Sequence, residues 1–151
     1  MSETYLGKRT KDLKILLVDG YLDEPSCLGV PPYISPHIRY AYGALLDLGI
    51  DSTSITYATI DQMRQAREGY LEAARSSDAV VIIAGATVPG RYLGGRPIST
   101  REISELGLAI EPVPLILGGP IVLCQGTIPG VSITCSEVAA ISLQEILGGR
   151  S

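Results

Sequence analysis

The residues best suited to chemistry gather in two long connections, each of which follows a short apolar run. The first connection, Gly20 to Ser35, begins directly after Asp19 and contains Asp23 and Glu24. These carboxylates could bind a metal ion or accept hydrogen bonds from the hydroxyls or amides of a ligand. The alternative is that Asp19 caps a turn and that the other two acids are solvated.

The length and stiffness of this connection favour a ligand site. It has about 16 residues, whereas a strand-to-helix connection usually has about 2–6. Prolines at 25, 31 and 32 fix their own φ angles and restrict the residues before them. A stiff polar loop after a first strand predicts the rim of a ligand site in an open α/β sheet.

The second long connection, Gly85 to Ile98, is rich in glycine and carries Arg91 and Arg96. Its glycines would let backbone amides approach a ligand, and the guanidinium groups could meet a phosphate or carboxylate. The spacing matches neither GxxxxGK[ST] nor GxGxxG, so nucleotide binding of those types is not expected. Gly118-Gly119, after another apolar run, would permit a flat ligand to approach or the chain to turn sharply.

Nucleophile and metal motifs are not evident. His37 is the one histidine, and no Ser-His-Asp or Cys-His arrangement can be assembled around it. Cys27, Cys124 and Cys135 would lie on one rim of the sheet, where they could converge on a metal or an iron–sulfur cluster. No CxxC spacing supports such a site, and cysteine is also a common small buried residue.

Composition limits the class of protein. The 151 residues suit one domain, and without Phe or Trp the core must be aliphatic. A formal net charge of -4 argues against a nucleic-acid surface, and no apolar run reaches the ~20 residues of a membrane span. The three cysteines are an odd number without close spacing, which does not suggest a disulfide framework and favours a reducing cytoplasm as the location. We expect residues 1–12 to be flexible and residues 13–151 to form a single domain, cut from a longer protein, because Gly148-Gly149 resembles a helix stop before a linker.

Apolar runs and helix signals alternate along the chain. The runs 14–19, 52–57, 79–84, 114–117 and 128–135 predict five strands, the second of them at an edge. Helices are predicted from Pro36 to Gly49, from Thr59 with a kink or break at Gly69, from Ser99 to Ile110, and from Ser136 onward. Thr59 with Gln62 and Ser99 with Glu102 have the capping-box spacing.

This alternation predicts an α/β fold, a doubly wound five-stranded parallel sheet between two helical layers. The flavodoxin-like strand order 2-1-3-4-5 places the first and third strands side by side. The two long connections leave these two strands. The crevice between them is therefore the expected ligand site.

Several segments together resemble a known family. They are DEPSCLGVPPYISPHIRY, LLDLG, TVPGRYLGGRPIS, LILGGP, TCSE and EILGG. In order and spacing these resemble the N-terminal cobalamin-binding-like, Rossmann-like domain of archaeal radical SAM proteins, also described as Fe-S oxidoreductases.

The resemblance implies a site and its partners. Cobalamin, when bound, would lie over the carboxyl ends of the strands, next to Asp19, Ser26, Pro31, Thr87, Arg91, Gly118, Gly119, Ser136 and Glu137. The DxHxxG motif that supplies a cobalt-ligating histidine elsewhere is absent, because Asp19 is followed by Gly-Tyr-Leu-Asp-Glu. The CxxxCxxC motif is absent too, so a 4Fe-4S cluster and S-adenosylmethionine would belong to a following radical SAM barrel domain.

Three functions follow as hypotheses. The chain is an accessory domain that binds cobalamin or shapes a substrate site without turnover of its own. Alternatively, it is a stand-alone small-molecule or nucleotide-binding module of flavodoxin-like fold. A third alternative is a structural domain that forms a homodimer.

Overall fold

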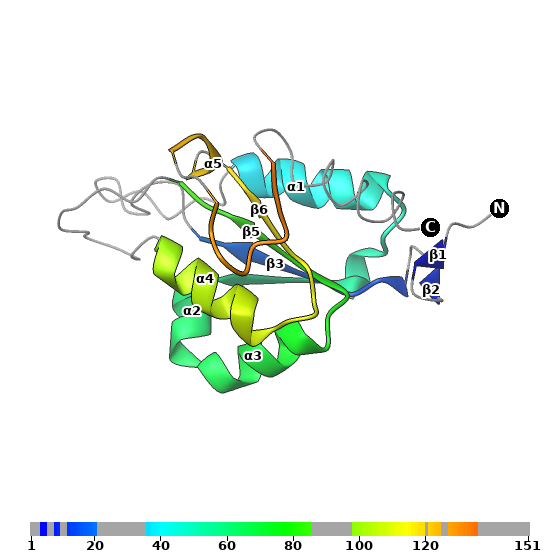
Figure 1. The fold of residues 1–151 in the computed structure, drawn as a ribbon. Coiled ribbons are helices and arrows are strands. Elements are labelled where there is room, and N and C mark those ends of the chain that lie inside the picture. Colours follow the sequence, from blue (N-terminus) through cyan, green and yellow to red (C-terminus); the bar gives the residue numbers. More distant parts are fainter. Residues whose placement is uncertain are drawn as a thin grey trace, which may run out of the picture.

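A parallel β-sheet lies at the centre of the fold (Figure 1). The computed structural model describes residues 4–5, 8–9, 12–20, 36–85, 98–119, 121–124 and 127–135. The body of the sheet contains β4 (Ile55–Thr59), β3 (Ile15–Asp19), β5 (Ala79–Ile83) and β6 (Leu115–Gly118), in that spatial order. The α/β class, the parallel pairing and the order 2-1-3-4 of these strands are therefore as predicted.

The expected fifth strand is much shorter than the apolar pattern of 128–135 suggested. Of this run only β7 (Ile133–Cys135) forms a strand. It pairs with β6, so the body of the sheet has four strands and a three-residue strand is added at its edge. Val131 N–H donates to the Ile128 carbonyl at 3.2 Å, which makes a turn of residues that we had assigned to the strand.

The pairing of β3 with β5 defines the middle of the sheet. All five residues of each strand are buried, and they pair in register from Ile15 opposite Ala79 to Asp19 opposite Ile83. Burial on both faces is what a continuous aliphatic run in a parallel sheet requires. These two runs were correctly predicted as strands for that reason.

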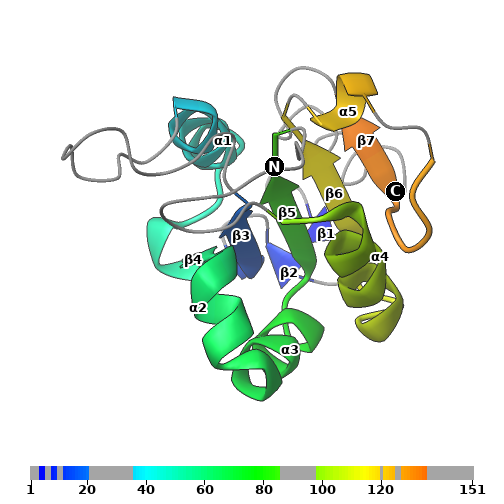
Figure 2. The ribbon, with the colours of Figure 1, turned by 90° about the vertical axis from the view of Figure 1, so that its left-hand side faces the viewer.

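Helices cover both faces of the sheet (Figures 1 and 2). On one face, α1 (Pro36–Asp47) packs Ile38, Ala41 and Leu45 against the odd-numbered residues of β3 and β5. It begins at Pro36, as predicted, because proline at the first helical position loses no hydrogen bond. It is followed by Gly49, whose φ of 99° is accessible to glycine at little cost.

The other face is covered by α2 (Ile60–Gln65), α3 (Arg67–Arg75) and α4 (Thr100–Ala109). Both predicted capping boxes are present: Thr59 and Gln62 at α2, and Ser99 and Glu102 at α4. Each box satisfies backbone N–H groups that a helix start would otherwise leave unpaired. These caps fix where the two helices begin, and the resulting α/β/α layering matches the prediction.

Two boundaries differ from the prediction. Asp51 accepts hydrogen bonds from the N–H and hydroxyl of Thr53 and thereby closes a 3-10 turn, η2 (Ser52–Ser54), so that β4 begins at Ile55 and not at Ser52. The helix break lies at Ala66, whose φ of -129° and ψ of 50° are not helical, and not at Gly69 inside α3. Ala66 N–H donates to the Gln62 carbonyl, and the Ala66 carbonyl accepts from Tyr70 N–H, so Ala66 both ends α2 and begins α3.

The remaining described elements are short. Within the first twelve residues, β1 (Thr4–Tyr5) pairs antiparallel with β2 (Lys8–Arg9). The helix α5 (Ile121–Cys124) follows β6. The predicted last helix, from Ser136, lies outside the described residues, as do most of the two long connections.

Two helical glycines allow a matched test of this packing. At Gly43 in α1, an added Cβ would meet no atom within 4 Å, whereas at Gly107 in α4 it would lie 2.4 Å from the Gly130 carbonyl oxygen. We expect Gly43→Ala to stabilise the fold by roughly 0.5–1 kcal/mol, because alanine loses less backbone entropy. Gly107→Ala should destabilise it by about 1–3 kcal/mol through overpacking.

Urea unfolding of the two variants measures both effects on the same chain. Equal stabilisation by the two substitutions would contradict the close contact between α4 and the 128–131 turn.

Candidate functional site

The carboxyl ends of β3, β5 and β6 lie side by side (Figure 1). We call this end of the sheet the carboxyl edge, which is distinct from the outer strand β4. Register places Asp19 beside Ile83 and Ile83 beside Gly118. Asp19, Gly118 and Gly119 are thus the predicted site residues that the structure describes, and it brings them to the same edge. The switch point between β3 and β5, from which the two long connections leave, is also where we predicted it.

Asp19 is the buried charged residue of this edge. Its exposed fraction is 4%, and within the described residues no other charged or polar side chain is buried. The hydroxyl of Tyr57 donates a hydrogen bond to Asp19 Oδ2 at 2.9 Å. A buried carboxylate requires such donors, because burial removes the water that would otherwise solvate its charge.

The sequence analysis did not predict a role for Tyr57, because that role depends on how β4 pairs with β3. It pairs with Leu17 in register, and side chains two residues apart point to the same face of a sheet. Tyr57 therefore shares a face with Asp19, two residues beyond Leu17. The pattern STSITY showed a strand, but only the register between β3 and β4 shows which tyrosine reaches the acid.

Backbone hydrogen bonds join the chain segments at this edge. Gly20 N–H donates to the Ile83 carbonyl at 2.8 Å, and Ile98 N–H donates to the Gly20 carbonyl at 2.9 Å. Ala84 N–H donates to the Gly118 carbonyl at 3.0 Å, and Ile121 N–H donates to the Ala84 carbonyl at 3.1 Å. The start of the first long connection and the two ends of the second are therefore held in place beside Asp19.

The glycines of this edge serve chain packing. A Cβ on Gly20 would lie 2.5 Å from Cγ2 of Ile98, and one on Gly119 would lie 2.5 Å from the Ala84 carbonyl oxygen. Gly119 also has a φ of 96°, a conformation that other residues rarely adopt. We had interpreted Gly118-Gly119 as room for a flat ligand or a sharp turn, and at Gly119 the close neighbour is the protein's own backbone.

The other predicted site residues lie outside the described residues: Ser26, Pro31, Thr87, Arg91, Ser136 and Glu137, with Asp23, Glu24, Cys27 and Arg96. For His37, Cys124 and Cys135 only the backbone is placed, in the first turn of α1 and at the ends of α5 and β7. Within the described ranges, no three His, Cys, Asp or Glu side chains come together as a metal site.

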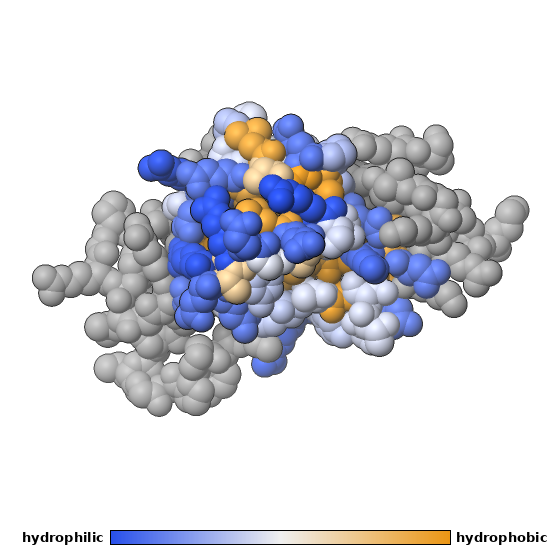
Figure 3. All heavy atoms as spheres, turned by 90° about the horizontal axis from the view of Figure 1, so that it is seen from below, coloured by the Kyte–Doolittle hydropathy of each residue, from blue (hydrophilic) through white to orange (hydrophobic). Residues whose placement is uncertain are grey.

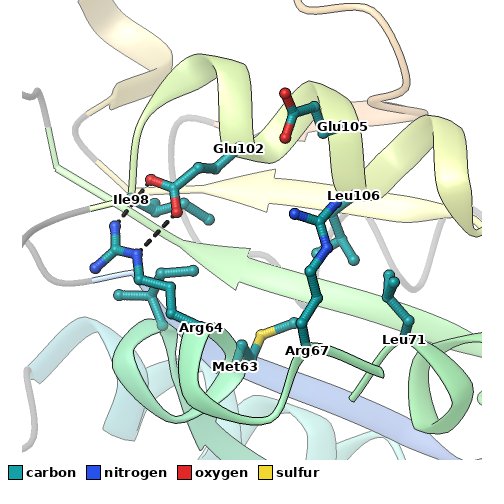
Figure 4. Close-up of a pocket in the computed structure, with 9 residues that line it drawn as sticks. Met63, Arg64, Arg67, Leu71, Ile98, Glu102, Glu105 and Leu106 are labelled. Carbon is teal, nitrogen blue, oxygen red and sulfur yellow. Dashed lines mark hydrogen bonds and ion pairs between the residues drawn. The ribbon is translucent and has the colours of Figure 1, made fainter. Parts of the chain in front are cut away.

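A hollow lies on the face of the sheet that α2, α3 and α4 cover, between these helices (Figure 4). It has a volume of about 170 Å³, and Met63, Leu71 and Leu106 line it together with Arg64 and Glu102. Seen from this side, the molecule is mostly hydrophilic, with apolar atoms across its middle (Figure 3). No sequence pattern had indicated this hollow.

An ion pair bridges the hollow. Arg64 Nε and Nη2 each donate to one oxygen of Glu102 at 2.8 Å, and Arg64 Nη1 donates to Asp61 at 3.0 Å. Partial burial raises the pKa of Glu102, but the hydrogen bonds from Arg64 and the Ser99 backbone outweigh it, so its pKa lies below the usual value. The hydrogen bond with Glu102 raises the pKa of Arg64. This ion pair joins α2 to α4 and is structural in character.

Sequence comparisons identify relatives in two archaea. The chain is 49% identical over 111 residues to an uncharacterized protein of Archaeoglobus fulgidus, a match that covers 74% of this chain and 20% of the relative. It is 39% identical over 107 residues to the uncharacterized protein MJ0274 of Methanocaldococcus jannaschii, covering 71% and 19%. The chain thus spans about a fifth of the length of these curated relatives.

No family model matches the chain, and two solved structures are distantly similar to it. The radical S-adenosylmethionine methyltransferase TsrM of Kitasatospora setae has a TM-score of 0.44 and 23% identity, over 70% of this chain and 19% of TsrM. The β-glucosidase EmGH1 of Erythrobacter marinus has a TM-score of 0.43 and 14% identity, over 93% and 25%. Neither likeness is close enough to bear on function.

In the part of the chain that the structure describes, no helix has the length and apolar character needed to cross a membrane.

The hydrogen bond to Asp19 can be tested by removing one hydroxyl. Tyr57→Phe should destabilise the fold by about 1–2 kcal/mol, because a buried carboxylate loses a donor. Tyr40→Phe is the control, since Tyr40 is 68% exposed on α1, and this change should alter stability by less than about 0.5 kcal/mol. Chemical denaturation gives both values, and equal effects would mean that the Tyr57 hydroxyl does not support Asp19.

The ion pair predicts a pH dependence. Because the pKa of Glu102 is lower in the folded chain than its usual 4.5, its contribution to stability is complete above that pH and is lost as the pH falls through the folded-state pKa. Glu102→Gln should therefore cost about 1 kcal/mol near neutral pH, a modest value for a partly exposed pair, and progressively less below pH ~4.

Glu105→Gln provides the matched control for this ion pair. Glu105 pairs with Arg101, whose side chain is 87% exposed, so this variant should show almost no effect at any pH. Unfolding free energies measured between pH 3 and 7, in parallel for both variants, would refute the account if the Glu102→Gln difference grew on acidification.

Proposed function

We propose that this chain is an accessory domain of a longer radical SAM protein, and that the carboxyl edge of its sheet faces the substrate of that protein. The domain would help to shape the substrate site and would have no turnover alone. The iron–sulfur cluster and S-adenosylmethionine would be held by a separate barrel domain of the same polypeptide.

One observation carries the proposal: a buried carboxylate, Asp19, lies at the end of the central strand and is held by Tyr57. In open α/β sheets, ligands bind outside the carboxyl ends of the strands, at the point where the strand order reverses. Asp19 occupies that point, between the starts of the two long connections. A carboxylate there would accept hydrogen bonds from a hydroxyl, amide or ammonium group of a substrate.

The relatives support a setting within a larger protein. Both archaeal relatives are about five times as long as the matched region, so this fold makes up a minor part of each. The resemblance of the loop segments to those of archaeal radical SAM proteins supplies the class of that protein. It is a resemblance in the order and spacing of motifs.

Cobalamin fits the described residues poorly. The Cβ positions of Gly20 and Gly119 are filled by Ile98 and by the Ala84 carbonyl, so these two glycines do not themselves provide room for a corrin ring. No described side chain at this edge offers an imidazole to cobalt. We therefore favour the substrate-shaping form of the proposal over the cobalamin-binding form and derive no step through cobalt.

Equilibrium dialysis against hydroxocobalamin separates these two forms. The substrate-shaping form predicts no retained corrin absorbance at roughly 100 µM, well above the affinity of an ordinary cofactor site. Retention by the wild type that is lost in Asp19→Asn, but kept in the control Asp47→Asn on the exposed end of α1, would instead establish a corrin site at this edge.

The DNA that follows codon 151 tests the longer-protein part of the proposal. We expect the reading frame to continue into a CxxxCxxC segment, whose thiolates would hold the cluster. A stop codon directly after Ser151 would overturn the accessory role, whatever the dialysis shows.

A further inference from the structure

The strand β4 has the properties of an interaction surface. It lies at one end of the sheet order and pairs with β3 on one side. An edge strand presents backbone N–H and C=O groups to any strand that can align with it. Side chains of this strand are also accessible, because Thr56 is exposed and Tyr57 is 39% exposed.

The strand β4 lacks three features that commonly protect an edge strand, namely proline, charged residues and a bulge. Its sequence, Ile-Thr-Tyr-Ala-Thr, contains no proline and no charged residue. It pairs with β3 through all five of its residues without a bulge. Natural edge strands usually carry lysine, proline or a bulge, which prevent pairing with other chains. Three of these five residues are β-branched, and a fourth is aromatic, as is typical of paired strands.

We infer that β4 is the pairing edge for a second copy of this chain, in an antiparallel, two-fold symmetric dimer. In such a dimer the same strand meets itself, so the surface must be self-complementary. With Tyr57 at the two-fold axis, Ile55 would lie opposite Thr59 and Thr56 opposite Ala58. The pairing brings no like charges together and buries the exposed Tyr57 rings against each other.

The area that β4 can bury is small, and this favours a weak dimer. A stable interface buries about 800 Å² on each partner. Five residues of strand give only a small part of that area, so the dimer should be weak and concentration-dependent. We expect it to form in the micromolar to millimolar range. The interface shares Tyr57 with the Asp19 site, but the inference does not rest on the function proposed for that site.

Sedimentation velocity on the intact chain, from about 10 µM to about 1 mM, tests the inference. The wild type should shift from monomer to dimer. Thr56→Lys, which places like charges near the two-fold axis, should weaken dimerisation at least tenfold. Ser52→Lys adds the same charge to the exposed 3-10 turn outside the strand, and it should change the dimerisation constant by less than threefold.

Amide hydrogen exchange of the wild type tests the location without any variant. Exchange of residues 55–59 should slow as concentration rises, whereas exchange in β6, which lies on the far side of β5 from β4, should not change. A monomer at every concentration would overturn the inference. A dimer that Thr56→Lys leaves intact, or one with no concentration-dependent protection of β4, would place the interface elsewhere and overturn it equally.

Discussion

The parallel pairing of β3 with β5 is the constraint on which the rest of the structure depends. All ten residues of these two strands are buried, and all but Asp19 are apolar. Helices must therefore cover both faces of the sheet. Because parallel strands end at the same edge, the two long connections begin side by side. The hydrogen bonds from Gly20 to Ile83 and from Ile98 to Gly20 then hold the first residue of one connection beside the last residue of the other.

The same constraint explains why one carboxylate can be buried at that edge. Asp19 continues the register of a strand that is otherwise wholly apolar, and it is exposed to only 4%. The cost of burying its charge is offset by donors that the fold holds in place, of which the Tyr57 hydroxyl is one. The Asp19 carboxylate is thereby held in one orientation at the strand ends, where doubly wound sheets bind ligands.

Strong local signals made much of this architecture predictable. The continuous runs of β3 and β5 and the capping boxes at Thr59 and Ser99 depend on near neighbours only, and each was found where expected. The errors arose where weak signals competed. Asp51 closed a 3-10 turn at the start of a β-rich segment, and the break between α2 and α3 occurred at Ala66. The contact of Tyr57 with Asp19 depends on the register between strands, which no single segment encodes.

The central claim is that the carboxyl edge around Asp19 faces the substrate site of a longer protein. A crystal structure of the full-length Archaeoglobus fulgidus relative would test it most directly. We predict that the strand ends corresponding to Asp19, Ile83 and Gly118 lie against the remaining four fifths of the polypeptide, with the residue at the position of Asp19 lining an enclosed cavity there. A structure in which this edge faces solvent, and the opposite edge of the sheet contacts the rest of the protein, would contradict the account.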